Sequence, residues 1–170
     1  MFACNGILFN HESPRRGENF VTRKTTRGVA AFLKAGIKLR LGSLHARRDW
    51  SHARDYFEAM WLMLQQPAPS GYVIGTGIGR KVRDLVELIL GLVSLDWRDH
   101  VDLDLACVRP AEVFEFLAGP SKANRKLGWY PRIGFKEMIR EMLETDLRPA
   151  GLDPDQCIRA VPIAQGPIPR

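Results

Sequence analysis

The chain has 170 residues and a formal net charge of +6, with 45% hydrophobic and 26% charged residues. This composition is typical of a globular protein, and no apolar run approaches the roughly 18–20 residues that span a bilayer, so we expect no membrane contact. Three cysteines without C-x-x-C spacing, and no basic leader before an apolar block, favour a cytoplasmic location.

The positive charge is concentrated in the first third of the chain. Residues 1–54 hold 11 Lys and Arg against three acidic residues. An anionic partner is therefore expected for this part. A nucleic-acid-binding module is one reading, but the basic residues are scattered and no nucleic-acid-binding motif accompanies them. We predict a small phosphorylated ligand and no nucleic acid.

The chain opens on an apolar run, residues 2–9, that predicts a buried strand. Residues 10–18 are polar and contain a proline and a glycine, which predicts a loop. In an α/β sheet, polar side chains at the end of a buried strand mark a ligand site. A helix should follow from Asn19, a good N-cap residue, to about Ala35.

Next we expect a short strand at 39–41 and a helix that starts at Ser51. The second helix has apolar residues at spacings i, i+3, i+4 and i+7, which predicts an amphipathic helix. These apolar residues are Phe57, Met60, Trp61 and Leu64.

The remaining chain continues to alternate between strand and helix patterns, which indicates an α/β fold. The expected elements are a strand at 72–74, helices over 82–93, 121–128 and 135–147, a strand at 100–105 and a helical turn opened by 109–112. Residues 1–147 are thus predicted to be folded. Residues 148–170 contain many prolines and are predicted to be a disordered tail.

The residue patterns of known catalytic and metal sites are missing. The segment at 75–79 resembles a dinucleotide-binding turn, but Arg80 stands where its third glycine belongs, so we predict a tight turn. The four histidines lack metal-ligand spacing, and no Tyr-x-x-x-Lys pair or Gly-x-Ser-x-Gly turn occurs. We therefore assign no catalytic residue and no metal ligand to this chain.

Nine short motifs, in order, make the chain resemble the GDP-mannose 4,6-dehydratase family of extended short-chain dehydrogenases/reductases. They are NGILFNHESPRRG at 5–17, FVTRK at 20–24, RDW at 48–50, AMW at 59–61, QQ at 65–66, YVI at 72–74, RPAEV at 109–113, PSKA at 120–123 and KLGW at 126–129. The resemblance covers about residues 1–147. It aligns with the C-terminal half of the family only.

The resemblance therefore implies the C-terminal part of an extended short-chain dehydrogenase/reductase fold. This part comprises the last strands of the Rossmann sheet and a small α/β substrate-binding lobe. The N-terminal Rossmann half has no counterpart in this sequence, nor do the family's catalytic Thr, Glu, Tyr and Lys.

In the family, NADP takes a hydride from GDP-mannose, water is eliminated, and the returned hydride yields GDP-4-keto-6-deoxymannose. The resemblance implies this lyase function and a GDP-mannose ligand, and we expect the chain to be inactive alone. The alternative is a non-catalytic nucleotide-sugar-binding remnant, or an oligomerisation partner of a full-length dehydratase. A homo-oligomer is also expected from the family.

The resemblance further implies roles for eight residues, among which cations suit phosphate oxygens and a carboxylate suits ribose hydroxyls or guanine N–H groups. The implied cofactor contacts are His11 and Arg16, and the implied substrate contacts are Asn10, Val21, Lys24, Arg48, Arg109 and Glu112.

Three purely structural readings stay open beside these roles. His11 would be a hydrogen-bonded loop histidine. Arg48 and Asp49 would form an ion pair at a helix start. Arg109 and Glu112, three residues apart, would pair with each other.

Overall fold

The computed structural model describes residues 1–104, 106 and 113–159. The expected helical turn at 109–112 and the last part of the expected tail, 160–170, lie outside these residues. The elements in order are β1 (Asn5–Leu8), β2 (Asn10–Glu12), α1 (Val21–Ala35), β3 (Leu39–Leu41), β4 (Arg47–His52), α2 (Ala53–Leu64), β5 (Gly71–Ile74), β6 (Gly79–Lys81), α3 (Val82–Leu92), α4 (Trp97–His100), β7 (Val101–Leu103), β8 (Glu115–Phe116), α5 (Ser121–Leu127), α6 (Phe135–Leu147), the 3₁₀ turn η2 (Arg148–Ala150) and α7 (Pro154–Cys157). The α/β prediction is confirmed.

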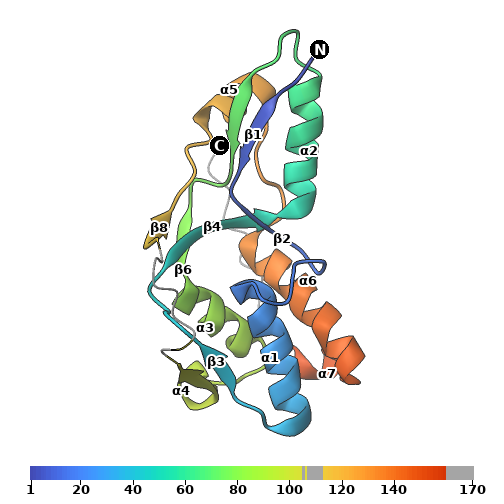
Figure 1. Ribbon diagram of the computed structural model, residues 1–170. Helices are drawn as coiled ribbons and strands as arrows, with labels where there is room; N and C mark the ends of the chain where they lie inside the picture. Colours follow the sequence, from blue (N-terminus) through green and yellow to red (C-terminus); the bar gives the residue numbers. More distant parts are fainter. Residues whose placement is uncertain (105, 107–112, 160–170) are drawn as a thin grey trace.

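The elements form two parts joined by β4 (Figure 1). In the upper part, β1 and β5 pair in parallel, and α2 and α5 pack against them. In the lower part, α1, α3 and α6 enclose the larger core, beside the parallel pair of β3 and β7. Between the two parts, β4 pairs with β2, β6 and β8.

Several short strands escaped prediction from the sequence. The predicted strand at 2–9 occupies only β1, and the predicted loop begins with β2, which pairs in parallel with β4. The segment of β4 is largely polar, so it carries no alternation of apolar residues. Strands on both of its edges pair with it and stabilise it. These partners are distant in sequence, so the local pattern did not indicate a strand.

Helix α2 buries a different face from the one its apolar residues predict. Its apolar stripe is exposed, with Phe57 at 72% and Trp61 at 59% of full accessibility. The side chains that point inward are those of Asp55, Tyr56, Ala59 and Met63. The backbone N–H groups of Arg132 and Ile133 donate to the buried carboxylate of Asp55, both at 3.1 Å. The predicted helix is present, but among the described residues its apolar stripe is exposed and does not line the core.

Residues 148–159 are packed, although a disordered tail was expected to start at 148. They form η2 and α7, and Ile158 is buried in the lower core. The Arg159 N–H donates to the Leu92 carbonyl at 3.0 Å, which fastens this segment to the end of α3. Apolar residues between the prolines provide the packing that composition alone did not reveal.

Candidate functional site

A cavity of about 210 Å³ lies between the start of α1, β2 and β4. Four residues predicted to bind the substrate come together in its lining: Asn10, Val21, Lys24 and Arg48. Ligand pockets usually measure about 300–1,000 Å³, so this cavity matches part of a nucleotide sugar rather than all of it. We call it the site cavity below.

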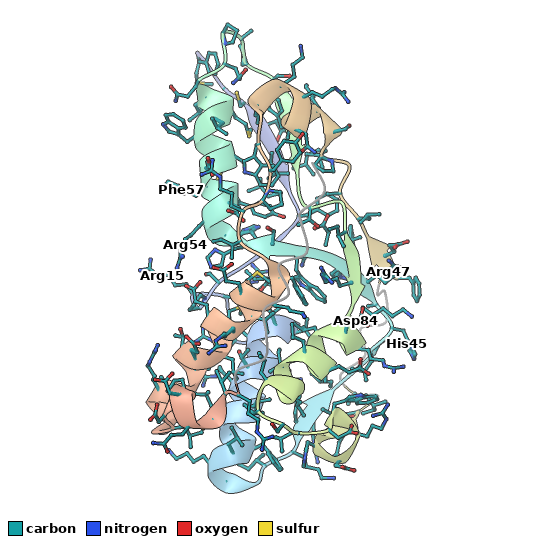
Figure 2. All side chains as sticks on the ribbon, turned by 180° about the vertical axis from the view of Figure 1, so that it is seen from behind. Arg15, His45, Arg47, Arg54, Phe57 and Asp84 are labelled. Carbon is teal, nitrogen blue, oxygen red and sulfur yellow. The ribbon has the colours of Figure 1, made fainter. Side chains whose placement is uncertain are left out.

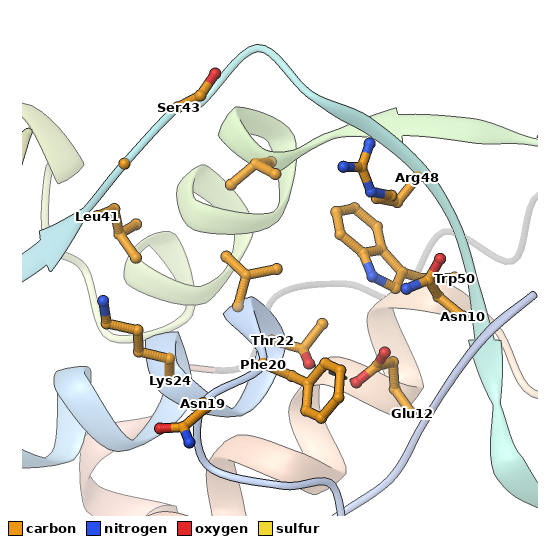
Figure 3. A pocket seen from close by; sticks show the side chains of 13 residues that line it. Asn10, Glu12, Asn19, Phe20, Thr22, Lys24, Leu41, Ser43, Arg48 and Trp50 are labelled. Carbon is orange, nitrogen blue, oxygen red and sulfur yellow. Dashed lines mark hydrogen bonds between the residues drawn. The ribbon is translucent and has the colours of Figure 1, made fainter. Parts of the chain in front are cut away.

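Two cations from different elements face the site cavity. Lys24 comes from the first turns of α1, and Arg48 comes from β4 above Trp50 (Figure 3). One Arg48 nitrogen donates to the Arg47 carbonyl at 2.7 Å, and the guanidinium lies 5.5 Å from the centre of the Phe116 ring. Two cations around one small cavity favour an anionic ligand such as a phosphate group.

Glu12 is the buried acidic group of the site cavity. Its carboxylate accepts a short hydrogen bond from the Thr22 hydroxyl and lies 3.2 Å from Arg16 Nε, although that N–H has no hydrogen-bonding geometry to it. Burial raises the pKa of Glu12, and this outweighs the lowering by Thr22, Arg16 and His11. The carboxyl therefore holds a proton more tightly in the folded chain than in the unfolded one.

This shift predicts a pH effect in the substitution Glu12→Gln. Because the folded pKa is raised above the ordinary 4.5, the stability contributed by Glu12 is full below that value and falls as pH rises through the folded pKa. The amide of the variant does not titrate, so the parent should lose unfolding free energy relative to the variant across this window. Urea denaturation at several pH values from about 4 to about 7 measures the difference.

The control is Glu18→Gln, which removes a carboxylate that is exposed and pairs with Arg27. An exposed carboxylate has little desolvation cost, so its variant should follow the parent closely over the same pH range. A parent that gains stability over Glu12→Gln as pH rises would contradict the assignment.

The two predicted cofactor residues lie beside the site cavity and do not line it. His11 Nδ1 is 2.9 Å from the Phe9 carbonyl, and its ring is 5.1 Å from that of Tyr56. The Arg16 guanidinium lies 3.5 Å from the centre of the Phe20 ring. The predicted residues Arg109 and Glu112 lie outside the described residues.

The glycine-containing turn at 75–79 is filled by a carboxylate from this chain. Asp49 is fully buried in β4 and accepts from the Thr76 N–H at 2.9 Å, the Thr76 hydroxyl at 2.6 Å and the Gly77 N–H at 2.8 Å. A Cβ on Gly75 would collide with Ala118. The turn thus binds Asp49, and Asp49 does not form the helix-start ion pair that was one reading of the sequence.

Sequence reasoning missed several residues of the lining. Glu12 and Trp50 lie within the motifs quoted above, next to residues that were predicted to bind the substrate. Their position beside those residues was the signal that could have identified them. Thr22, one residue after Val21, faces Glu12 because α1 starts at that point. Ser43 follows β3, and nothing in its local sequence indicates the cavity. The members not predicted include Glu12, Asn19, Phe20, Thr22, Ser43 and Trp50.

Residues 1–104, 106 and 113–159 contain neither a metal-binding cluster nor a membrane-spanning helix. Within these residues, no group of three or more His, Cys, Asp or Glu side chains is placed to hold a metal ion. In the same part of the chain, no helix combines the length and apolar character needed to cross a membrane.

Sequence comparison gives one family. The family profile described as GDP-mannose 4,6 dehydratase matches residues 1–142. GDP-mannose 4,6 dehydratase 2 of Arabidopsis thaliana is 52% identical over 149 residues, which cover 86% of this chain and 40% of that protein. The human GDP-mannose 4,6 dehydratase is 47% identical, with 86% and 44% covered. The chain spans less than half the length of these relatives.

Solved structures share the fold. RMD from Pseudomonas aeruginosa, complexed with NADPH, aligns with a TM-score of 0.73 at 24% identity, covering 85% of this chain and 48% of that one. A dTDP-glucose 4,6-dehydratase from Streptomyces venezuelae, with NAD and TYD bound, gives 0.73 at 22% identity, covering 86% and 44%. The described residues therefore adopt part of the fold that these two structures share.

Proposed function

The chain belongs to the GDP-mannose 4,6-dehydratase family, and we propose that it supplies the GDP-mannose-binding part of the NADP-dependent conversion of GDP-mannose to GDP-4-keto-6-deoxymannose. The observation that carries this proposal is the meeting of Asn10, Val21, Lys24 and Arg48 around the site cavity. These residues come from three separate elements, and the resemblance had assigned all four to the substrate.

Each side chain has chemistry that suits a nucleoside diphosphate sugar. The Arg48 fork binds the diphosphate, and Lys24 adds a second positive charge at the start of α1. The Asn10 amide donates to or accepts from sugar hydroxyls, and Val21 provides an apolar contact. Arg109 with Glu112 is assigned to the nucleotide portion on the resemblance alone.

The described residues do not by themselves fit a whole NADP molecule. The turn at 75–79 offers no free phosphate site in its middle, because the N–H groups of Thr76 and Gly77 already donate to Asp49. His11 and Arg16 remain proposed cofactor contacts at the β2 end of the site, carried by the resemblance. Bound NADP supplies hydride acceptance and return, and no step of that chemistry is assigned to a residue of this chain.

The second candidate is a nucleotide-sugar-binding protein without catalysis, which associates with a full-length dehydratase. It is favoured by the lining of the site cavity, where Lys24 and Arg48 supply charge that suits the binding of a phosphate group. Both candidates require GDP binding in the site cavity. They differ in whether GDP-4-keto-6-deoxymannose forms when the chain is supplied with its partner half, NADP and GDP-mannose.

The decisive experiment compares GDP binding by the parent and by Arg48→Ala. Loss of a charge-assisted contact to phosphate costs about 1.5–3 kcal/mol, so the Kd for GDP should rise about 10- to 150-fold. Arg48→Lys keeps the charge without the fork and should fall in between. Titration calorimetry measures both values.

The matched control is Arg98→Ala, which removes an exposed arginine of α4 that pairs with Asp96 away from the cavity. It should leave the Kd for GDP unchanged. Thermal melting of each variant checks that the fold is kept. Equal GDP affinity of Arg48→Ala and the parent would refute the proposed site.

A further inference from the structure

Arg80 of β6 stands opposite Arg48 in the sheet. The antiparallel pairing of β4 with β6 makes Arg48 and Arg80 direct partners, and Arg47 and Lys81 are the next pair. Directly opposite residues of an antiparallel pair project from the same face, with Cβ atoms about 4.5–5.5 Å apart. The side chain of Arg80 therefore starts beside that of Arg48, which lines the site cavity.

Ring contacts place the end of the Arg80 side chain on the cavity face of the sheet. Its guanidinium lies 4.6 Å from the centre of the Phe135 ring. Phe135 stacks on Trp50, with ring centres 6.0 Å apart, and Trp50 lines the site cavity, as does Val82 two residues after Arg80. Arg80 is only partly buried, so this cation lies beside the cavity and keeps some contact with solvent.

Arg48 and Arg80 bring two positive charges together on one face of the sheet. Like charges directly opposite each other destabilise paired strands. On the other face, the neighbouring Arg47 is compensated by Glu115, with Nε 3.1 Å from Oε1. Arg80 forms no ion pair within the described residues. Its charge is therefore available to an anionic ligand of the site cavity.

We propose that Arg80 is a second phosphate-binding arginine of this site. Arg48 in the lining binds the phosphate next to the nucleoside, and Arg80 beside the cavity binds the phosphate that follows it. Through Arg80 the site prefers a nucleoside diphosphate to a nucleoside monophosphate. This inference rests on the proposed function, because it assumes a nucleotide in the site cavity, and it adds a residue that the resemblance did not assign.

Two guanidinium groups suit a diphosphate better than a single phosphate. Each planar fork donates two parallel hydrogen bonds to the oxygens of one phosphate group, so two forks are best satisfied by two adjacent groups. The cavity measures about 210 Å³ and holds only part of a nucleotide. The second phosphate of a diphosphate therefore extends to the side of the cavity, where Arg80 lies.

The test compares GDP and GMP as ligands of the parent chain and of Arg80→Met. Methionine keeps an unbranched apolar stem over the Phe135 ring and removes the charge. The Kd for GDP should rise about 10-fold or more, as for the loss of a charge-assisted hydrogen bond, and the Kd for GMP should change less than about 3-fold. Titration calorimetry at one fixed ionic strength measures all four values.

The matched control is Lys81→Met, which removes the same charge from the next residue of β6. Lys81 is exposed, and strand alternation directs it to the opposite face from Arg80. Its Kd for GDP should stay within about 2-fold of the parent value. A parent-like result here shows that net charge alone does not explain a loss of binding in Arg80→Met.

Thermal melting separates a binding role of Arg80 from a structural one. Because Arg80→Met removes a like charge beside Arg48, its melting temperature without ligand should not fall. The rise in melting temperature that GDP produces should be smaller in this variant than in the parent. A lower melting temperature without ligand, with an unchanged rise on adding GDP, would assign Arg80 to the fold and overturn the inference.

Arg48→Ala distinguishes a failure of this inference from a failure of the proposed function. A raised Kd for GDP in Arg48→Ala beside an unchanged Kd in Arg80→Met would overturn the role of Arg80 and leave the proposed function intact. Unchanged values in both variants would overturn both. Equal rises in the Kd for GDP and for GMP in Arg80→Met would overturn the preference for a diphosphate.

Discussion

Replacing Asp49 with alanine is expected to lower the free energy of unfolding by about 4 kcal/mol, since three backbone N–H groups and one hydroxyl lose a buried charged acceptor. The carboxylate accepts from Thr76, Gly77 and Ala118, the last at 3.3 Å, and so joins β4 to two other segments. Urea denaturation followed by circular dichroism measures the loss. GDP binding should weaken as well, because Arg48 precedes Asp49 in β4.

Asp49→Asn separates charge from shape in this prediction. Its single carbonyl oxygen can accept, but its amide group would face N–H donors, so we expect a loss nearly as large as for alanine. The matched control is Asp84→Ala, which removes an exposed carboxylate that accepts one N–H, that of Lys81, at 2.9 Å (Figure 2). Loss of such a cap costs about 1 kcal/mol. An Asp49→Ala loss no larger than that of Asp84→Ala would contradict the role assigned to Asp49.

The second large effect is expected for Asp146→Ala, at about 3–5 kcal/mol, because removing one member of a buried ion pair leaves the other charge uncompensated. Asp146 of α6 accepts from the Thr26 hydroxyl at 2.6 Å and from Arg23 Nε at 2.8 Å, both on α1. Arg23 also donates to the Pro14 carbonyl, so the same cation holds the loop before α1. The free energy of unfolding in urea is the measurement.

A double-mutant cycle identifies the cause of that loss. Because Arg23→Ala removes the stranded cation, the double variant with Asp146→Ala should be less destabilised than the sum of the single variants. Glu144→Ala is the control, since this half-exposed residue pairs with Arg140 four residues earlier and such a pair contributes about 0.3–0.5 kcal/mol. Additive single effects would exclude the ion pair as the main contribution.

Apolar periodicity predicted the long helices well and the short strands poorly. Helix α6 carries Met138, Ile139 and Met142 at helical spacing, and all three are buried in the lower core. By contrast, β4 and β6 consist largely of polar residues, and they form because neighbouring strands satisfy their backbone groups. Such pairing partners are distant in sequence, so no local pattern indicates them.

For the candidate site, the resemblance to a known family assigned residues to a ligand, which the periodicity of apolar residues could not do. The residue types of Lys24 and Arg48 suggested an anionic ligand, but only the motifs assigned them to one substrate, and the structure places both at one cavity. The sequence could not predict which face of α2 is buried. Its stripe at Phe57 and Trp61 satisfies the rule for a core-facing helix, yet the α2 side chains that pack in the upper core are Tyr56, Ala59 and Met63.

The division of the core into two clusters has a consequence for the folding of the chain. Among the described residues, the upper cluster buries eight apolar side chains and the lower cluster 21. Burial of apolar area is the main favourable term in folding, so the two parts contribute very unequally to cooperativity. We therefore expect the lower part, which carries the larger core, to resist local opening longer than the upper part.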